Sequence, residues 1–208
     1  MKAYFLNIIG WMLLPFMDGI AKYLSSEIHF MQVVWGRYFF MFFITLMISF
    51  IFFRKYLKWP MNINIQLVRG FLLFITTILF FYSISVISLP EALTLAFISP
   101  IVVTVLSIFI LRERVGIHRW IAVLTGFLGV LIILRPGFNE INFASISALL
   151  AGIIYALFLI YTRKLSFTDS PLVTLIFTGF VGTILITLII PFYWIDINLN
   201  HILLLFLL

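Results

Sequence analysis

The chain has 208 residues, of which 64% are hydrophobic and 10% are charged, whereas a soluble domain carries roughly 25% charged residues. Its formal net charge is +6 and it contains no cysteine, which excludes disulfides, thiol catalysis and cysteine-based metal sites. The low charged fraction excludes an ordinary soluble domain and indicates a protein that spans a lipid bilayer.

A helix needs about 20 apolar residues to cross a bilayer, and stretches near this length follow one another along the chain. The predicted spans are Tyr4–Ala21, Met31–Phe53, Gly70–Leu89, Ala92–Leu111, Ile121–Leu134, Ile146–Tyr161 and Leu172–Ile190. Their continuous apolar character disfavours a β-barrel, whose strands alternate over roughly 10 residues. The first span does not read as a signal peptide, because no A-x-A cleavage site follows it and further spans come after it. We therefore expect an all-α polytopic membrane protein.

The basic residues lie almost entirely in every second gap between these spans. With a cytoplasmic N-terminus, the inside segments hold most of them, namely Lys2, Arg54, Lys55, Lys58, Arg69, Arg112, Arg114, Arg119, Arg163 and Lys164. The outside loops hold Lys22 and Arg135, and Arg37 lies within the second span. This distribution follows the positive-inside rule. It explains the positive charge by membrane topology, so we expect a lipid bilayer and not a nucleic acid as the partner.

The segment Arg135-Pro136-Gly137 divides the chain, because proline cannot continue a helix and glycine tolerates the turn. Five predicted spans precede it, an odd number, so a second five-helix unit would be inverted relative to the first, as in many secondary transporters. We expect a complete first repeat over residues 1–135 and a partial second repeat over residues 136–208. An eighth apolar run begins at Ile202, and the chain reaches only Leu208.

Two ionisable residues fall inside predicted spans, where a charge is costly and often functional. At ~1.5 Å of rise per residue, Asp18 in the first span and Arg37 in the second both lie roughly 10 Å below the outer surface. Lys22 shares the helical face of Asp18 at i,i+4. The two could line a substrate path or take up a proton. The structural alternative is an ion pair that pins two helices, with Lys22 reaching the interface.

Pro100 interrupts the fourth span. It lacks an N–H group and frees the carbonyl of Ala96 one turn back, and broken helices near mid-membrane often hold substrates in transporters. Thr104 shares its helical face at i+4. Equally, the proline could be a packing kink and the threonine hydroxyl could bond to its own helix.

Glu91 follows Pro90 at the outer start of the fourth span. The helix dipole favours a carboxylate in a first turn, so Glu91 could be a helix cap. The alternative is a proton-coupling carboxylate at the mouth of a transport path. The sequence has no H-E-x-x-H, G-x-S-x-G, P-loop or G-x-G-x-x-G motif, which disfavours an intramembrane enzyme or an ATP-driven pump. We expect no metal and no cofactor.

Several motifs resemble EamA-type permeases of the drug/metabolite transporter superfamily. The segment Leu89-Pro-Glu-Ala-Leu-Thr-Leu-Ala-Phe-Ile-Ser-Pro100 is similar to the start of the fourth helix of these permeases. The later motifs continue into the fifth helix, and they are Leu111-Arg-Glu-Arg-Val115, Arg119-Trp120, Gly126-Phe-Leu-Gly-Val130 and Arg135-Pro-Gly137. The opening, with Gly10-Trp11, Lys22-Tyr-Leu24 and Arg37, resembles the start of the same family, including members that take up S-adenosylmethionine.

This resemblance implies a ten-helix inner-membrane carrier in which two inverted repeats enclose a substrate cavity. Such permeases move small organic metabolites such as amino acids, nucleosides and vitamins. Because the sequence has no ATPase motif, either coupling to a proton or other ion gradient or facilitated diffusion remains. Arg37, Glu91 and Pro100 lie on the family motifs and are cavity candidates, whereas Asp18 and Thr104 come from the spans alone. A complete second repeat would need roughly 80 more residues, so the alternatives are a homodimer that completes the cavity and a non-transporting fragment or scaffold.

Overall fold

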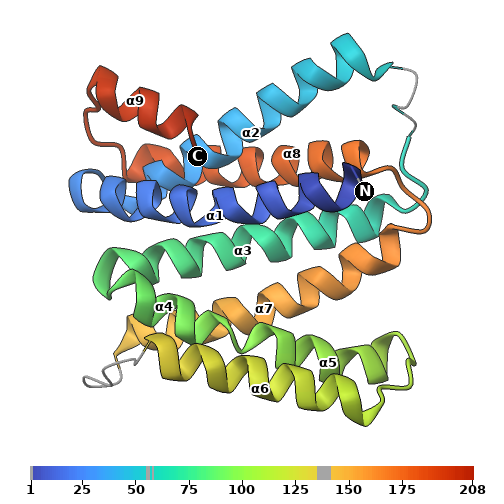
Figure 1. Ribbon diagram of the computed structural model, residues 1–208. Coiled ribbons are helices and arrows are strands. Elements are labelled where there is room, and N and C mark those ends of the chain that lie inside the picture. The colour runs from blue at the N-terminus through green and yellow to red at the C-terminus, as the bar shows by residue number, and fades with distance from the viewer. Residues whose placement is uncertain (1, 55–56, 58, 135–141) are drawn as a thin grey trace.

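The computed structural model describes residues 2–54, 57, 59–134 and 142–208, and in this part of the chain the regular structure is helical. The elements are α1 (Lys2–Glu27), α2 (Phe30–Phe52), α3 (Ile63–Val86), α4 (Leu89–Ala96), α5 (Ser99–Ile110), α6 (Ile117–Leu134), α7 (Phe143–Leu165), α8 (Pro171–Ile189), the 3₁₀ turn η2 (Ile190–Phe192) and α9 (Leu199–Phe206). Figure 1 shows them as a bundle of long, roughly parallel and antiparallel helices. The expected all-α fold is confirmed.

Five of the described segments are long and apolar enough to cross a membrane. They are α2, α3, α4 with α5, α7, and α8 with η2, and α6 is a shorter apolar helix. Large apolar side chains such as Phe50, Phe109 and Leu188 are mostly exposed on the outside of the bundle. In water such exposed apolar side chains would promote aggregation, whereas in a membrane they contact lipid tails. The chain is therefore a multi-pass membrane protein.

Helices α4, α7 and α8 begin where a short polar side chain accepts a hydrogen bond from an N–H group of the first turn. Asn142 Oδ1 accepts from the backbone N–H of Ser145 at 2.9 Å at the start of α7, and Ser170 accepts from Val173 at the start of α8. Pro171 occupies the first helical position of α8, where its missing N–H costs nothing. These caps fix where α7 and α8 begin.

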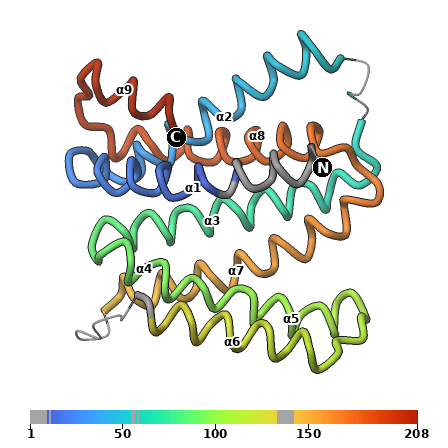
Figure 2. Tube along the Cα trace, in the orientation of Figure 1, coloured from blue at the N-terminus to red at the C-terminus, as the bar shows by residue number. Residues whose placement is uncertain are grey.

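Helix α3 lies at the centre of the bundle. It contacts α7 on one side and α2 and α8 on the other, and α6 lies at the edge beyond α5 (Figure 2). Gly70 of α3 faces α8 so closely that a Cβ there would lie 2.9 Å from the Cβ of Val181. The predicted boundary at residues 135–137 lies outside the described residues. Helix α7, which follows it, packs against α3, α4 and α5, so the chain on both sides of that boundary shares one core.

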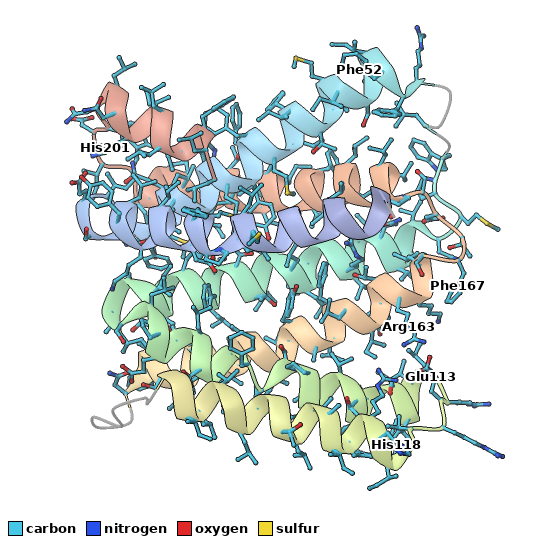
Figure 3. The ribbon with its side chains drawn as sticks, viewed as in Figure 1. Phe52, Glu113, His118, Arg163, Phe167 and His201 are labelled. Atoms are coloured by element: carbon cyan, nitrogen blue, oxygen red, sulfur yellow. The ribbon has the colours of Figure 1, made fainter. Side chains whose placement is uncertain are left out.

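Different polar residues lie at the two ends of the bundle, with Glu113 and Arg163 at one end and His201 at the other (Figure 3). At the Arg163 end, Glu113 in the α5–α6 loop pairs with Arg163 of α7 and, at 3.4 Å, with Arg119 of α6. Arg112, next to Glu113, adopts a left-handed φ of 55°. Glu113 therefore joins the α5–α6 loop to two helices.

At the His201 end, the Nε2 atom of His201 lies 2.8 Å from a carboxylate oxygen of Glu27. Its Nδ1 atom accepts from the backbone N–H of Asn198, so the ring proton lies on Nε2 and is donated to Glu27. The hydroxyl of Tyr23 also donates to Glu27. Hydrogen bonds from Tyr23 and then His201 hold the pKa of the Glu27 carboxyl below its ordinary value of 4.5. These contacts join α1 to α9.

Candidate functional site

A cavity of about 200 Å³ lies between α1, α2, α3, the α4–α5 junction and α7. Its lining is mainly apolar and aromatic, with a few polar groups contributed by separate helices. Pockets that bind small molecules commonly have this composition and lie between the helices of bundles. The cavity is therefore the candidate substrate site.

The α4–α5 junction forms one wall of this cavity. Helix α4 ends at Ala96 and α5 begins at Ser99, and both residues line the cavity. Pro100 has no N–H to donate to the carbonyl of Ala96, so the helical ladder is interrupted here. Gly152 of α7 faces the break, and a Cβ on it would lie 2.6 Å from the Ala96 oxygen. The absence of a side chain at Gly152 lets α7 approach the broken helix.

Asp18 of α1 and Arg37 of α2 both line the cavity. Both are partly buried, and they do not form an ion pair or a hydrogen bond with any side chain that the structure describes. The guanidinium of Arg37 lies over the ring of Phe81 at 5.5 Å from its centroid. The rise per residue of a helix predicts that these two charges lie at the same depth in the membrane, and in the structure both line one cavity.

Lys22 has a different environment. Its ammonium donates to the carbonyl oxygens of Ile84 and, at 3.0 Å, Ile87. These residues end α3, and a cation interacts favourably with the last carbonyls of a helix. Lys22 therefore joins α1 to the end of α3 and does not line the cavity.

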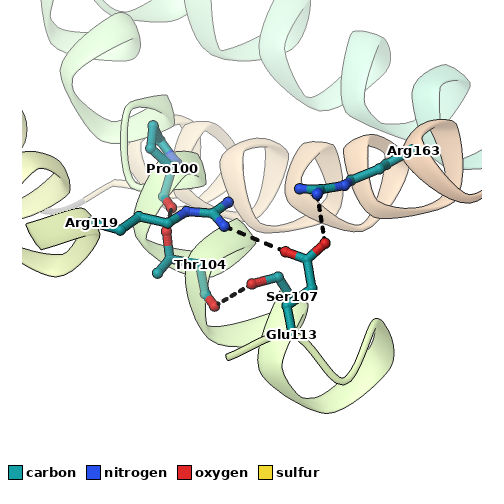
Figure 4. Close-up of polar contacts among 6 residues, drawn as sticks. All are labelled: Pro100, Thr104, Ser107, Glu113, Arg119 and Arg163. Carbon is teal, nitrogen blue, oxygen red and sulfur yellow. Dashed lines mark hydrogen bonds and ion pairs between the residues drawn. The ribbon is translucent and has the colours of Figure 1, made fainter. Parts of the chain in front are cut away.

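The remaining sequence candidates lie outside the lining of this cavity. Glu91 is in the first turn of α4, where its backbone N–H donates to the Ser88 hydroxyl at 3.4 Å. The hydroxyl of Thr104 donates to the carbonyl of Pro100 at 2.8 Å, and Ser107 donates to the carbonyl of Thr104 in turn (Figure 4). Pro100 itself lines a separate apolar cavity of about 360 Å³ between α5 and α6.

Polar residues that the sequence did not single out complete the cavity wall. Thr76 and Thr77 come from the middle of α3, Ser99 from the junction, and Tyr155 from α7. The hydroxyl of Thr77 lies 2.9 Å from that of the buried Tyr38. Isolated hydroxyls within long apolar runs were the available signal for these positions.

A second buried cation lies closer to the Arg163 end. The sequence places Arg69 before the third span, but α3 begins at Ile63 and Arg69 is only 5% exposed. Its Nε donates to Thr162 Oγ1 at 2.7 Å and its Nη1 donates to Thr178 Oγ1 at 2.6 Å. The guanidinium also lies 4.5 Å from the centroid of the Phe158 ring. Neutral groups of α7 and α8 thus hold this charge.

A multi-span helical bundle with a cavity between its helices and two charged side chains on the cavity wall fits a membrane transport protein. The model of the EamA-like transporter family matches residues 1–135, which is more than half of the chain. The chain belongs to the EamA-like transporter family and is a transporter, not an enzyme.

Relatives of known name agree with this assignment. The S-adenosylmethionine uptake transporter of Rickettsia bellii is 27% identical over 213 aligned residues, which cover 100% of this chain and 72% of the relative. That of Rickettsia prowazekii is 28% identical with the same coverage. The riboflavin transporter of Vibrio cholerae is 37% identical over 102 residues, 49% of this chain and 32% of the relative.

Proposed function

We propose that the chain acts as a secondary carrier for a small organic metabolite, with the cavity between α1, α2, α3, the α4–α5 junction and α7 as its substrate site. The observation that carries this proposal is the pair of charges, Asp18 and Arg37, on a cavity inside a bundle of the EamA-like transporter family. Charges within membrane spans are commonly retained for substrate or ion pathways. The named relatives carry S-adenosylmethionine and riboflavin, both of them small organic metabolites.

The proposed mechanism is alternating access. Residues 1–135 form one inverted repeat and the chain from residue 136 belongs to the other, so a rocking motion between them exposes the cavity to each side in turn. The Glu113–Arg163 ion pair joins the α5–α6 loop to α7 at one end of the bundle, and the Glu27–His201 contact joins α1 to α9 at the other. The Arg163 end and the N-terminus face the cytoplasm, in an inner membrane, because the basic loops gather at that end.

The energy source in this proposal is a solute or ion gradient. Half-buried Asp18 is the carboxylate best placed to take up a proton during transport, because it lines the cavity and has no bonded partner among the described residues. Glu91, in the first turn of α4, remains a second candidate for the carboxylate that takes up a proton. Thr104 and Pro100 would act through the shape of the broken helix, because they do not line the cavity.

The function is tested by reconstituting the chain into proteoliposomes and measuring uptake of radiolabelled solutes. The panel contains S-adenosylmethionine, methionine, adenosine and riboflavin. We expect saturable uptake of at least one solute above the rate in protein-free vesicles, with competition by the same solute unlabelled. If no solute in a panel widened to other amino acids, nucleosides and vitamins moves faster than in protein-free vesicles, the carrier function is wrong.

A further inference from the structure

We infer, on the basis of the proposed carrier function, that the substrate is dipolar. It carries an anionic group, a carboxylate in the simplest case, that binds Arg37, and a cationic group that binds Asp18, both at the same time. This inference rests on the presence of Asp18 and Arg37 in the lining of one cavity.

The first support is that neither charge is bonded to a side chain among the described residues, and that Asp18 and Arg37 interact only electrostatically, without direct contact. Asp18 and Arg37 line the same cavity, yet no ion pair joins them among the described residues. A charge taken out of water is costly unless it is paired. A neutral solute would leave each charge with this unbonded interaction alone, and a solute with one charge would bind one of them. A solute with two opposite charges provides a bonded partner for each.

The second support is the contrast with other buried cations. Arg69 uses its Nε and Nη1 atoms on the hydroxyls of Thr162 and Thr178, and Lys22 is bound by carbonyls at the end of α3. Their donors are already used within the protein. Among the described residues the guanidinium of Arg37 lies over the Phe81 ring and donates no hydrogen bond, so its N–H groups are available for the bidentate geometry that a carboxylate favours.

The third support is the rest of the lining. The aromatic residues Phe80, Phe81, Phe97 and Tyr155 line the same cavity as the two charges. Aromatic faces attract cations, and they provide apolar surface for an organic group. The site therefore suits an organic body that bears two opposite charges, and not an inorganic ion.

The test compares Asp18→Asn and Arg37→Gln with wild type in the same proteoliposomes. The probes are S-adenosylmethionine and methionine, which are dipolar, methioninol, which lacks the carboxylate, and adenosine and riboflavin, which are uncharged. We expect each variant to lower uptake of the dipolar probes by about tenfold or more, which is about 1.4 kcal/mol in binding. Arg37→Gln should have little effect on how strongly unlabelled methioninol inhibits uptake of a labelled probe, because methioninol has no carboxylate that could bind Arg37.

The matched controls neutralise exposed charges of the same types, Arg114→Gln and Asp196→Asn. Both should transport at the wild-type rate, and size-exclusion profiles in detergent show whether each variant is folded. If only uncharged or singly charged probes are carried, or both cavity variants transport dipolar probes at the wild-type rate, the dipolar assignment is overturned and the carrier function stands. If wild type carries nothing, both are overturned.

Discussion

Replacing Gly152 by alanine tests whether α7 packs directly against the broken helix at the cavity wall. The added Cβ would lie 2.6 Å from the carbonyl oxygen of Ala96 and 2.9 Å from Cγ2 of Ile98. The nearest atom is backbone and cannot rotate away, so α7 must shift. Overpacking of this kind costs about 1–3 kcal/mol.

The matched control is Gly126→Ala on α6, where nothing lies within 4 Å of the new Cβ. Alanine is favoured over glycine in a helix by up to about 1 kcal/mol, and this gain applies to both variants. Their difference therefore isolates the clash. At about 2–4 °C per kcal/mol for a chain of this size, Gly152→Ala should melt roughly 2–12 °C below Gly126→Ala, on the same approximate scale.

The assay is thermal unfolding of both purified variants in one detergent, followed by tryptophan fluorescence. Uptake by Gly152→Ala should also fall, because the shift of α7 displaces Tyr155 and Ala151 in the cavity wall. Equal melting temperatures for the two variants, or a higher one for Gly152→Ala, would refute the close packing of α7 on the α4–α5 junction.

The remaining predictions concern the buried cation and the His201 end. Thr178→Val removes a hydroxyl that accepts from Arg69 and should lower the free energy of unfolding by about 1.5–3 kcal/mol. The control is Thr125→Val, because the hydroxyl of Thr125 bonds to carbonyls of its own helix, and its free energy of unfolding should stay within about 0.5 kcal/mol of wild type. An equal loss of unfolding free energy in the two variants would contradict the role of Thr178 in binding Arg69. Because the pKa of Glu27 is lowered from 4.5, the stabilisation from its carboxylate is present above pH 4.5 and is lost as the pH falls through the lowered value. The melting difference between wild type and Glu27→Gln should thus be present near about pH 5 and close towards about pH 3, and a difference that persists at the lower pH contradicts this.

The helices could be predicted from the sequence because the length of an apolar run in a membrane is a direct physical requirement. The depth of Asp18 and Arg37 followed in the same way, since helical rise converts residue number into distance. The length of an apolar stretch does not show which neighbouring helix each face of that span contacts. Pro100 lines the apolar cavity between α5 and α6, whereas Thr104 is buried and donates to the Pro100 carbonyl, so neither residue lines the cavity that holds Asp18 and Arg37.

Arg69 is a second example of a residue whose environment could not be predicted from the sequence. Basic residues mark the ends of predicted spans, so Arg69 reads as part of a loop. In the structure, hydroxyls of α7 and α8, more than 90 positions further along the chain, bind it within the bundle. A compensation of this kind depends on tertiary packing, and no local pattern in α3 predicts it. The EamA-like motifs, by contrast, identified the family before any contact was known, and the family match over residues 1–135 confirms it.

The central claim is that solute passes through the cavity between α1, α2, α3, the α4–α5 junction and α7. The most direct measurement compares initial uptake rates in proteoliposomes for Ala151→Phe, which fills this cavity from α7, and Ala122→Phe, which fills the separate apolar cavity between α5 and α6. We expect the first variant to lose uptake by about tenfold or more while the second retains the wild-type rate. Normal uptake by folded Ala151→Phe, or loss of uptake only in Ala122→Phe, would contradict the account.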